Sequence, residues 1–271
     1  MAKCMFICPP EMTSLSRVSD AHLILQQFVI EGSRYANYFH RRITDYNDYV
    51  ILDNGVAEGL DAPSLGNLLD KADLVGAQEM VMPDVMFDLY ATVDRTSHAI
   101  VDLYELRPES ESRPKIHVVV QGEDFGLKAS CFNYFAGLSQ VDIISFNESR
   151  RGDVPRRCEV IKLLHARGYL QTALSRGKKI HYLGRGIEWR EDAKVAHEYI
   201  GEGLRSIDTT FAAKAAMRGC TLDEADSKYR GPKSTHGFFS TAGMPDDAFA
   251  LYEKNVKIWK EVWKDDGGPL K

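Results

Sequence analysis

The chain has 271 residues, of which 44% are hydrophobic and 27% charged, and this balance excludes a disordered chain and indicates a folded globular protein. Its formal net charge of -5 at pH 7 argues against a protein that coats nucleic acid non-specifically, because that mode of binding depends on concentrated Lys and Arg. A local basic groove remains compatible with this charge.

Short apolar runs recur along the chain and end in small or polar residues, as β-strands do. The segments between them can form helices, so the order is strand, helix, strand. The predicted strands are 3–10 (KCMFICPP), 21–28 (AHLILQQF), 48–55 (DYVILDNG), 79–85 (EMVMPDV), 115–124 (KIHVVVQGED), 141–149 (VDIISFNES), 178–186 (KKIHYLGRG) and 205–211 (RSIDTTF).

Helical spacing of apolar residues supports this alternation. Eight strand-helix repeats predict a (β/α)8 TIM-type barrel, and the chain length suits one domain over residues 1–271. An open doubly wound sheet is the alternative, but it usually has a Gly-rich phosphate loop after its first strand, and "ICPPEMTS" is not one. The predicted helices are Pro63–Ala72, Tyr90–Leu106, Arg156–Arg167, Glu191–Glu202 and 210–219.

The segment 219–271 differs in character and is interpreted as a C-terminal extension of the barrel. Residues 229–243 (YRGPKSTHGFFSTAG) indicate an irregular loop. Residues 245–263 indicate an amphipathic helix, with Pro245 at its start and acids in its first turn. We expect this helix to pack on the barrel.

Other sequence features exclude further classes of protein. No run approaches the roughly 18 apolar residues of a membrane-spanning helix, and the N-terminus does not look like a signal peptide, so we expect a cytoplasmic protein without a membrane partner. The five cysteines are scattered and form no CxxC pair, so we expect reduced thiols. The histidines show no HxH or HExxH pattern, and neither a metal nor another cofactor is expected.

The carboxyl ends of barrel strands meet at one mouth, where such folds carry their chemistry. Any one acid there could instead cap a helix. Two carboxylates across a pocket suit the cleavage of a glycosidic bond, and a carboxylate beside an amide suits the edge of a guanine-like base. The polar strand-end residues are Asp53, Asp84, Gln121, Asn147, Glu148, the Gly184-Arg185-Gly186 segment and Asp208.

In this order the strand ends resemble the tRNA-guanine transglycosylase superfamily, and most closely its short phage-type DNA 7-deazaguanine transglycosylases. "LDNG" with Asp53 is similar to the Asp-Ser-Gly-Gly motif, whose aspartate transfers protons. "MPDV" with Asp84 is similar to the strand end that recognises the base. "VQG" with Gln121 matches the family letter for letter, which implies that this glutamine contacts the base.

The later motifs match less evenly. "DIISFNE" keeps only Glu148 of a Gly-Gly-Leu-Ala-Val-Gly-Glu motif, whereas "HYLGRG" with Gly184 is similar to "YLMGVG"; both residues are expected at the base. "SIDTTF" places the nucleophile of the family on Asp208. The resemblance covers about residues 1 to 218, but the zinc site Cys-x-Cys-x-x-Cys of the tRNA enzymes is absent from the sequence, which disfavours tRNA as substrate.

The resemblance implies that guanine in DNA is exchanged for a 7-deazaguanine such as 7-cyano-7-deazaguanine, through a covalent glycosyl-aspartate. If the chain is phage-encoded, its compartment is the host cytoplasm. The tRNA enzymes form homodimers, which raises the same assembly here, although the zinc region of their interface is missing. The expected contacts to the nucleic-acid backbone are Arg150, Arg151, Arg156, Arg157 and Arg185.

Three alternatives stay open at this point. The chain could act on tRNA, it could hydrolyse nucleosides or other N-glycosides with the same carboxylates, or it could bind a purine without catalysis. His181 is interpreted as a packed or capping residue rather than a catalyst, and the spacing of Tyr35, Tyr38 and Phe39 as that of a helix facing the core.

Overall fold

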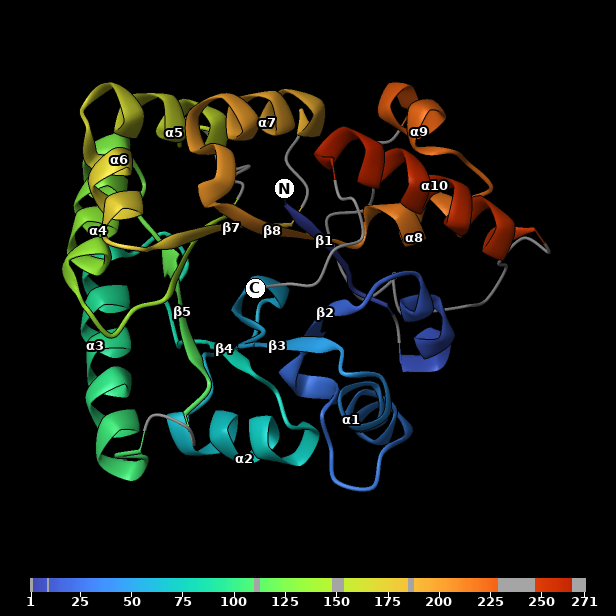
Figure 1. Cartoon of the computed structure of the whole chain (residues 1–271), viewed down its shortest axis with the longest axis horizontal. Coiled ribbons are helices and arrows are strands. Elements are labelled where there is room, and N and C mark those ends of the chain that lie inside the picture. Colours follow the sequence, from blue (N-terminus) through green and yellow to red (C-terminus); the bar gives the residue numbers. More distant parts are fainter. Residues whose placement is uncertain are drawn as a thin grey trace.

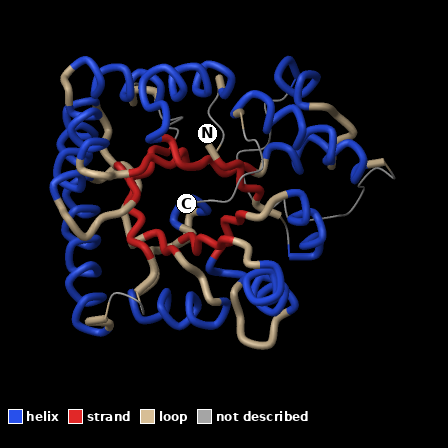
Figure 2. The backbone as a smooth tube through the Cα atoms, in the orientation of Figure 1, coloured by secondary structure: helices blue, strands red, loops and turns tan. Residues whose placement is uncertain are grey.

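The computed structural model describes residues 2–8, 10–109, 113–147, 154–184, 188–228 and 247–264. Within these ranges, eight parallel strands form one sheet in the order β1-β8-β7-β6-β5-β4-β3-β2, which curves into a nearly closed barrel (Figure 2). The predicted TIM-type fold is therefore confirmed. The strands are β1 (Lys3–Phe6), β2 (Ala21–Leu25), β3 (Tyr49–Asp53), β4 (Glu79–Val81), β5 (Lys115–Val120), β6 (Ile143–Asn147), β7 (Lys179–Leu183) and β8 (Leu204–Thr209).

Helices surround the barrel on its outer side (Figure 1). Each of the five helical segments predicted from spacing contains a helix, although the fourth one ends at Val195 and continues as a π-helical turn, Ala196–Ile200. The helices are α1 (Arg34–Tyr46), α2 (Leu65–Val75), α3 (Leu89–Leu106), α4 (Phe125–Gly137), α5 (Arg157–Ala166), α6 (Tyr169–Ser175), α7 (Trp189–Val195), α8 (Phe211–Ala216), α9 (Leu222–Lys228) and α10 (Ala248–Trp263).

Helix α10 packs on the barrel as the sequence predicts. The indole of Trp259 stacks on Trp189 of α7 with ring centroids 4.7 Å apart. Asn255 connects α10 to α9 and α8. Its Oδ1 accepts from the N–H of Leu222, and its Nδ2 donates to the carbonyl of Ala212. The predicted loop 229–243 lies outside the described residues.

The inside of the barrel contains a cluster of apolar side chains and a set of buried polar side chains. Inward positions of β1 to β5 form an apolar cluster of Met5, Ile7, Ala21, Leu23, Leu25, Ile51, Val81 and Val119. Side chains alternate between the two faces of a strand, so the polar residues two positions before Asn147, Leu183 and Asp208 on β6, β7 and β8 also point inward. These buried polar residues include Ser145, His181 and Ser206.

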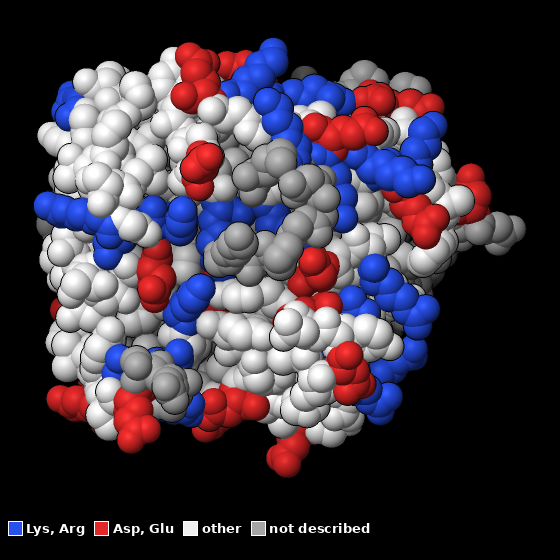
Figure 3. Space-filling view, viewed as in Figure 1, with Lys and Arg blue, Asp and Glu red and all other residues white. Residues whose placement is uncertain are grey.

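Surface and thiol features agree with the composition. Acidic and basic side chains are interspersed over the face shown in Figure 3. All five cysteines are free, and four of them are buried. Among the residues that the structure describes, no helix is both long and apolar enough to cross a membrane.

Candidate active site

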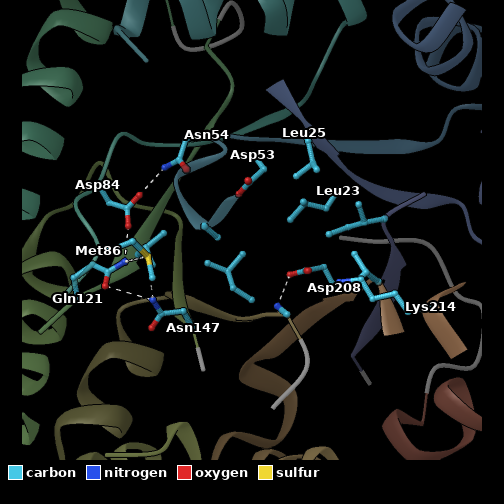
Figure 4. Close-up of a pocket in the computed structure, with 16 residues that line it drawn as sticks. Leu23, Leu25, Asp53, Asn54, Asp84, Met86, Gln121, Asn147, Asp208 and Lys214 are labelled. Carbon is cyan, nitrogen blue, oxygen red and sulfur yellow. Dashed lines mark hydrogen bonds between the residues drawn. The ribbon is translucent and has the colours of Figure 1, made fainter. Parts of the chain in front are cut away.

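A cavity of about 270 Å³ lies at the carboxyl ends of the strands. Five of the residues predicted from strand ends for catalysis or base binding line it together (Figure 4). They come from segments far apart in sequence, so the barrel brings them to one place. The cavity is lined by Ile7, Leu23, Leu25, Asp53, Asn54, Ala57, Asp84, Met86, Val119, Gln121, Asn147, Leu183, Gly184, Asp208, Thr210 and Lys214.

Asp53 ends β3 and is held by the turn that follows it. Its Oδ2 accepts a 3.0 Å hydrogen bond from the N–H of Gly55, whose φ of 76° is a left-handed conformation that glycine adopts without strain. This hydrogen bond fixes the carboxylate just before the short 3-10 helix Val56–Glu58, whose N-cap is Gly55. The side chain of Asp53 is buried, with 7% of its surface exposed, and it faces the cavity.

Asp84 and Gln121 form one hydrogen-bonded wall of the cavity (Figure 4). The Nε2 of Gln121 donates to Oδ2 of Asp84 at 2.5 Å, and the Nδ2 of Asn54 donates to Oδ1 at 2.7 Å. Burial raises the pKa of Asp84 above its ordinary value, and the two amide hydrogen bonds oppose this rise without cancelling it. Asn54, which was not among the residues predicted for the site, also lines the cavity and is therefore part of the site.

The backbone around Gln121 fixes the orientation of its amide. Its Oε1 accepts from the N–H of Phe87 at 3.0 Å and from the Nδ2 of Asn147 at 3.4 Å. Phe87 has a φ of 65°, which is a strained conformation for a non-glycine residue and is often found at functional sites. Gly122 has no room for a side chain, because a Cβ there would lie 2.8 Å from the Cβ of Leu127.

Asp208 projects into the cavity from β8, on the side opposite Asp84 and Gln121 (Figure 4). Its Oδ1 accepts two hydrogen bonds, from the Nε2 of His181 at 2.9 Å and from the N–H of Gly184 at 3.0 Å. Its Oδ2 has no hydrogen-bond partner within the described part of the chain, which leaves this oxygen available to a ligand. Gly184 therefore lines the cavity as predicted, but its N–H holds Asp208 rather than facing a base.

Lys214, which no motif predicted, also lines the cavity beside Asp208 and Thr210. It lies one turn into α8, four residues after Thr210, so helical periodicity brings both to the mouth. The signal in the sequence was its position soon after the strand that carries Asp208. A lysine there adds positive charge to a cavity otherwise rich in carboxylates.

The expectation that Arg157 contacts nucleic acid is wrong. The side chain is fully buried, and its guanidinium donates to Asp192 at 2.7 Å and to the carbonyl of Leu183 at 3.0 Å. It also lies over the ring of Tyr182. Burying such a group requires an ion pair and hydrogen bonds, and Arg157 has both, so it holds the carboxyl end of β7 next to α7 and cannot reach a phosphate.

Of the other residues expected to contact the nucleic-acid backbone, Arg156 lies within the described part of the chain. Arg156 is partly exposed and pairs with Glu188 at 3.0 Å. Arg150, Arg151, Arg185 and Glu148 lie outside the described residues. No group of three or more His, Cys, Asp or Glu residues that could hold a metal ion occurs in the described ranges.

Comparisons with known proteins bear on the fold. No protein-family model matches the chain, and no curated protein sequence matches it. Among solved structures, it is similar to the YdjI aldolase from Escherichia coli K12, with a TM-score of 0.55 and 13% identity over 98% of this chain and 92% of that one. An HpcH/HpaI aldolase from Desulfitobacterium hafniense DCB-2 gives 0.51 and 12% identity over 88% and 95%. These likenesses show a TIM-type barrel.

Proposed function

We propose that this chain is a base-exchange glycosyltransferase that replaces guanine in DNA with a 7-deazaguanine such as 7-cyano-7-deazaguanine. The observation that carries the proposal is the shared cavity: Asp53 and Asp208 both face it, and the hydrogen-bonded pair Asp84–Gln121 forms its wall. The order of strand-end motifs that resembles the transglycosylase superfamily supports the same assignment.

In the first step, Asp208 Oδ2 attacks C1′ of the target nucleotide as the bond from C1′ to N9 of guanine breaks. The electron pair of that bond passes to guanine, which takes up a proton from Asp53. The result is a glycosyl ester on Asp208. Holding Oδ1 by two donors suits this step, because it fixes the plane of the carboxylate while Oδ2 faces the substrate.

In the second step, N9 of the incoming 7-deazaguanine attacks C1′ and its proton passes to Asp53. The ester bond breaks, and Asp208 leaves as a carboxylate. Two displacements at C1′ retain its configuration, as in retaining glycosidases. No net oxidation or hydrolysis occurs, so the reaction needs neither a redox cofactor nor a water molecule.

Asp84 suits recognition of the base. An ionised carboxylate accepts several hydrogen bonds, so the oxygens that already accept from Gln121 and Asn54 can also accept from N1–H and the exocyclic amine of guanine. The same edge is present in 7-deazaguanines, which differ from guanine in the five-membered ring. One recognition wall therefore serves both the leaving and the incoming base.

The volume of the cavity restricts the form of the substrate. At about 270 Å³, it is below the usual size of a pocket for a drug-sized ligand, and a base pair does not fit. The target nucleotide must therefore be single-stranded or flipped out of the duplex, which costs a few kcal/mol of unstacking and pairing free energy.

Incorporation of a labelled base tests this function. DNA incubated with the protein and tritiated 7-cyano-7-deazaguanine is expected to become labelled, and Asp208→Asn should lower the rate to background. Label in tRNA but never in DNA would contradict the DNA assignment. Release of free guanine without any incorporation would indicate a hydrolase instead.

A further inference from the structure

His181 is the buried neighbour of Asp208 inside the barrel. It has no exposed surface, and its Nε2 lies 2.9 Å from Asp208 Oδ1. An ionised carboxylate can only accept a hydrogen bond, so Nε2 must carry the proton in this contact. His181 does not line the cavity and therefore acts on a substrate only through Asp208.

The other ring nitrogen of His181 is also engaged. Its Nδ1 lies 2.7 Å from the hydroxyl of Ser206, which is two residues before Asp208 on the same face of β8. In the neutral ring, the hydroxyl donates to Nδ1 and leaves the proton on Nε2. Asp208, which can only accept, thus fixes this tautomer, and the Ser206 hydroxyl, which can donate or accept, holds the ring at its other nitrogen.

A β-bulge makes this contact possible. The pairing of β7 with β8 shifts between Ile180 and His181, so that Ile180 pairs with Leu204 and His181 with Ser206, with Arg205 as the extra residue. Bulges of this kind re-aim side chains next to active sites. Without the shift, His181 would lie opposite Arg205, and the ring would lose its hydroxyl partner.

A second buried histidine, His117, packs against the ring of His181 inside the barrel. The imidazole of His117 packs edge-on against it, with centroids 5.0 Å apart. His117 in turn contacts Ser145 and lies 2.6 Å from Glu79. All these side chains are buried, so bulk water does not compete for the hydrogen bonds of His181.

We propose that His181 is a positioning residue for the nucleophile: it holds Asp208 Oδ1 from inside the barrel, while Ser206 holds its other ring nitrogen, so that Oδ2 meets C1′. This role rests on the proposed function. Its geometry can be tested without any activity, because the position of the imidazole proton is a property of the folded protein.

Substitutions separate positioning from packing. His181→Phe keeps the ring volume and removes the donor, and it should lower kcat for base exchange about 100-fold, the size expected when a reacting group is misplaced. KM for the incoming base should stay unchanged, because Asp84 and Gln121 are untouched. His181→Gln, which restores an N–H donor, should recover part of kcat. A wild-type kcat in His181→Phe would overturn the proposal.

The two strands that pair with β7 offer a matched pair of serine variants. Ser206→Ala removes the hydroxyl behind His181 and should lower kcat, whereas Ser145→Ala removes the equivalent hydroxyl behind His117 and should leave kcat unchanged. Both serines are fully buried, on inward positions of β6 and β8, the two strands that pair with β7, so the loss of packing is similar. Equal effects of the two variants would show a purely structural role and contradict the proposal.

Nitrogen NMR of histidine-labelled protein tests the proposal without any measurement of activity. We expect His181 to carry a proton on Nε2 and none on Nδ1, and Ser206→Ala to weaken this preference. A proton on Nδ1 would overturn the tautomer assignment. If the wild-type protein exchanges no base on DNA or tRNA, the proposed function fails, while the NMR result still decides the contact with Asp208.

Discussion

Gln121 donates a 2.5 Å hydrogen bond to Asp84, and this bond joins two strand ends that lie 37 residues apart in the sequence. Both side chains are almost fully buried at the edge of the cavity. Their contact fixes a carboxylate with a raised pKa in one orientation at the wall of the cavity. The affinity for a base should therefore depend on the ionisation of Asp84.

Base binding should weaken as the pH falls through the raised pKa of Asp84. The ionised form accepts hydrogen bonds from the base, and burial shifts its protonation above the ordinary value of about 3.9. Calorimetric titration with guanine from pH 7 to pH 4 should show a rising Kd in the wild type. Asp84→Asn should bind weakly at every pH, and a wild-type Kd that does not change with pH would contradict this role.

Replacing Gly122 with alanine should disturb the hydrogen-bonded wall that Asp84 and Gln121 form. A Cβ at this position would lie 2.8 Å from Leu127 Cβ and 2.9 Å from the backbone nitrogen of Lys128, and the φ of 145° disfavours any side chain. We expect Gly122→Ala to cost about 1–3 kcal/mol of unfolding free energy and to raise KM for the base, because Gln121 must move.

Gly66→Ala is the matched control for that substitution. Gly66 lies in α2 with open space around it, so alanine there should leave KM unchanged and stabilise the helix by up to about 1 kcal/mol. Urea unfolding and steady-state kinetics measure both effects. Equal KM values in the two variants would show that Gly122 does not affect binding of the base.

Arg157→Met should destabilise the protein by about 3–5 kcal/mol, because it leaves Asp192 buried without its ion pair. The neighbouring variant Arg156→Ala should change stability by less than about 1 kcal/mol, since its pair with Glu188 is on the surface. Urea unfolding compares the two. An Arg157→Met variant that is as stable as the wild type but binds DNA less well would contradict this structural role of Arg157.

Acid should destabilise the protein, because it protonates the buried pair of His117 and Glu79. Burial lowers the pKa of His117 to about 4, while the unfolded residue takes up its proton near 6.5. Burial alone would raise the pKa of Glu79, but Arg205 and His117 outweigh it and hold that pKa far below its usual range. In both cases the unfolded state binds more protons, so stability falls as the pH falls.

His117 alone accounts for a difference on the order of 3 kcal/mol in unfolding free energy between pH 7 and pH 4. The measurement is urea unfolding at several pH values in this window. The slope of stability against pH should be smaller in His117→Phe than in the wild type. An identical slope in the two proteins would rule out His117 as a source of the acid sensitivity.

Much of the fold and part of the site could be predicted from the sequence. The eight strands were recognisable because each buried run stops at a polar residue, and parallel strands bring those residues to one mouth. This is why the sequence alone groups four residues at the mouth: Asp53, Asp84, Gln121 and Asp208. Their individual roles came from the resemblance and stay predictions.

The environment of Arg157 and His181 could not be predicted, for two physical reasons. Arg157 belongs to a basic run that is typical of an exposed surface, but its partner Asp192 is 35 residues away and becomes its neighbour only after folding. The contact of His181 with Asp208 depends on the shifted register of β7 and β8. One local signal was present: Ser206 and Asp208 are alternate residues of one strand, so a polar face reaches below the mouth.

The mass of the intact protein after denaturation tests the central claim most directly. A reaction with a DNA oligonucleotide that contains guanine, quenched in denaturant, should leave a covalent adduct of DNA on the wild-type chain, and peptide mapping should place it on Asp208. Asp208→Asn should form none, and Asp53→Asn should form less. An adduct on another residue, or base exchange that continues in Asp208→Asn, would contradict the assignment of Asp208 as the nucleophile.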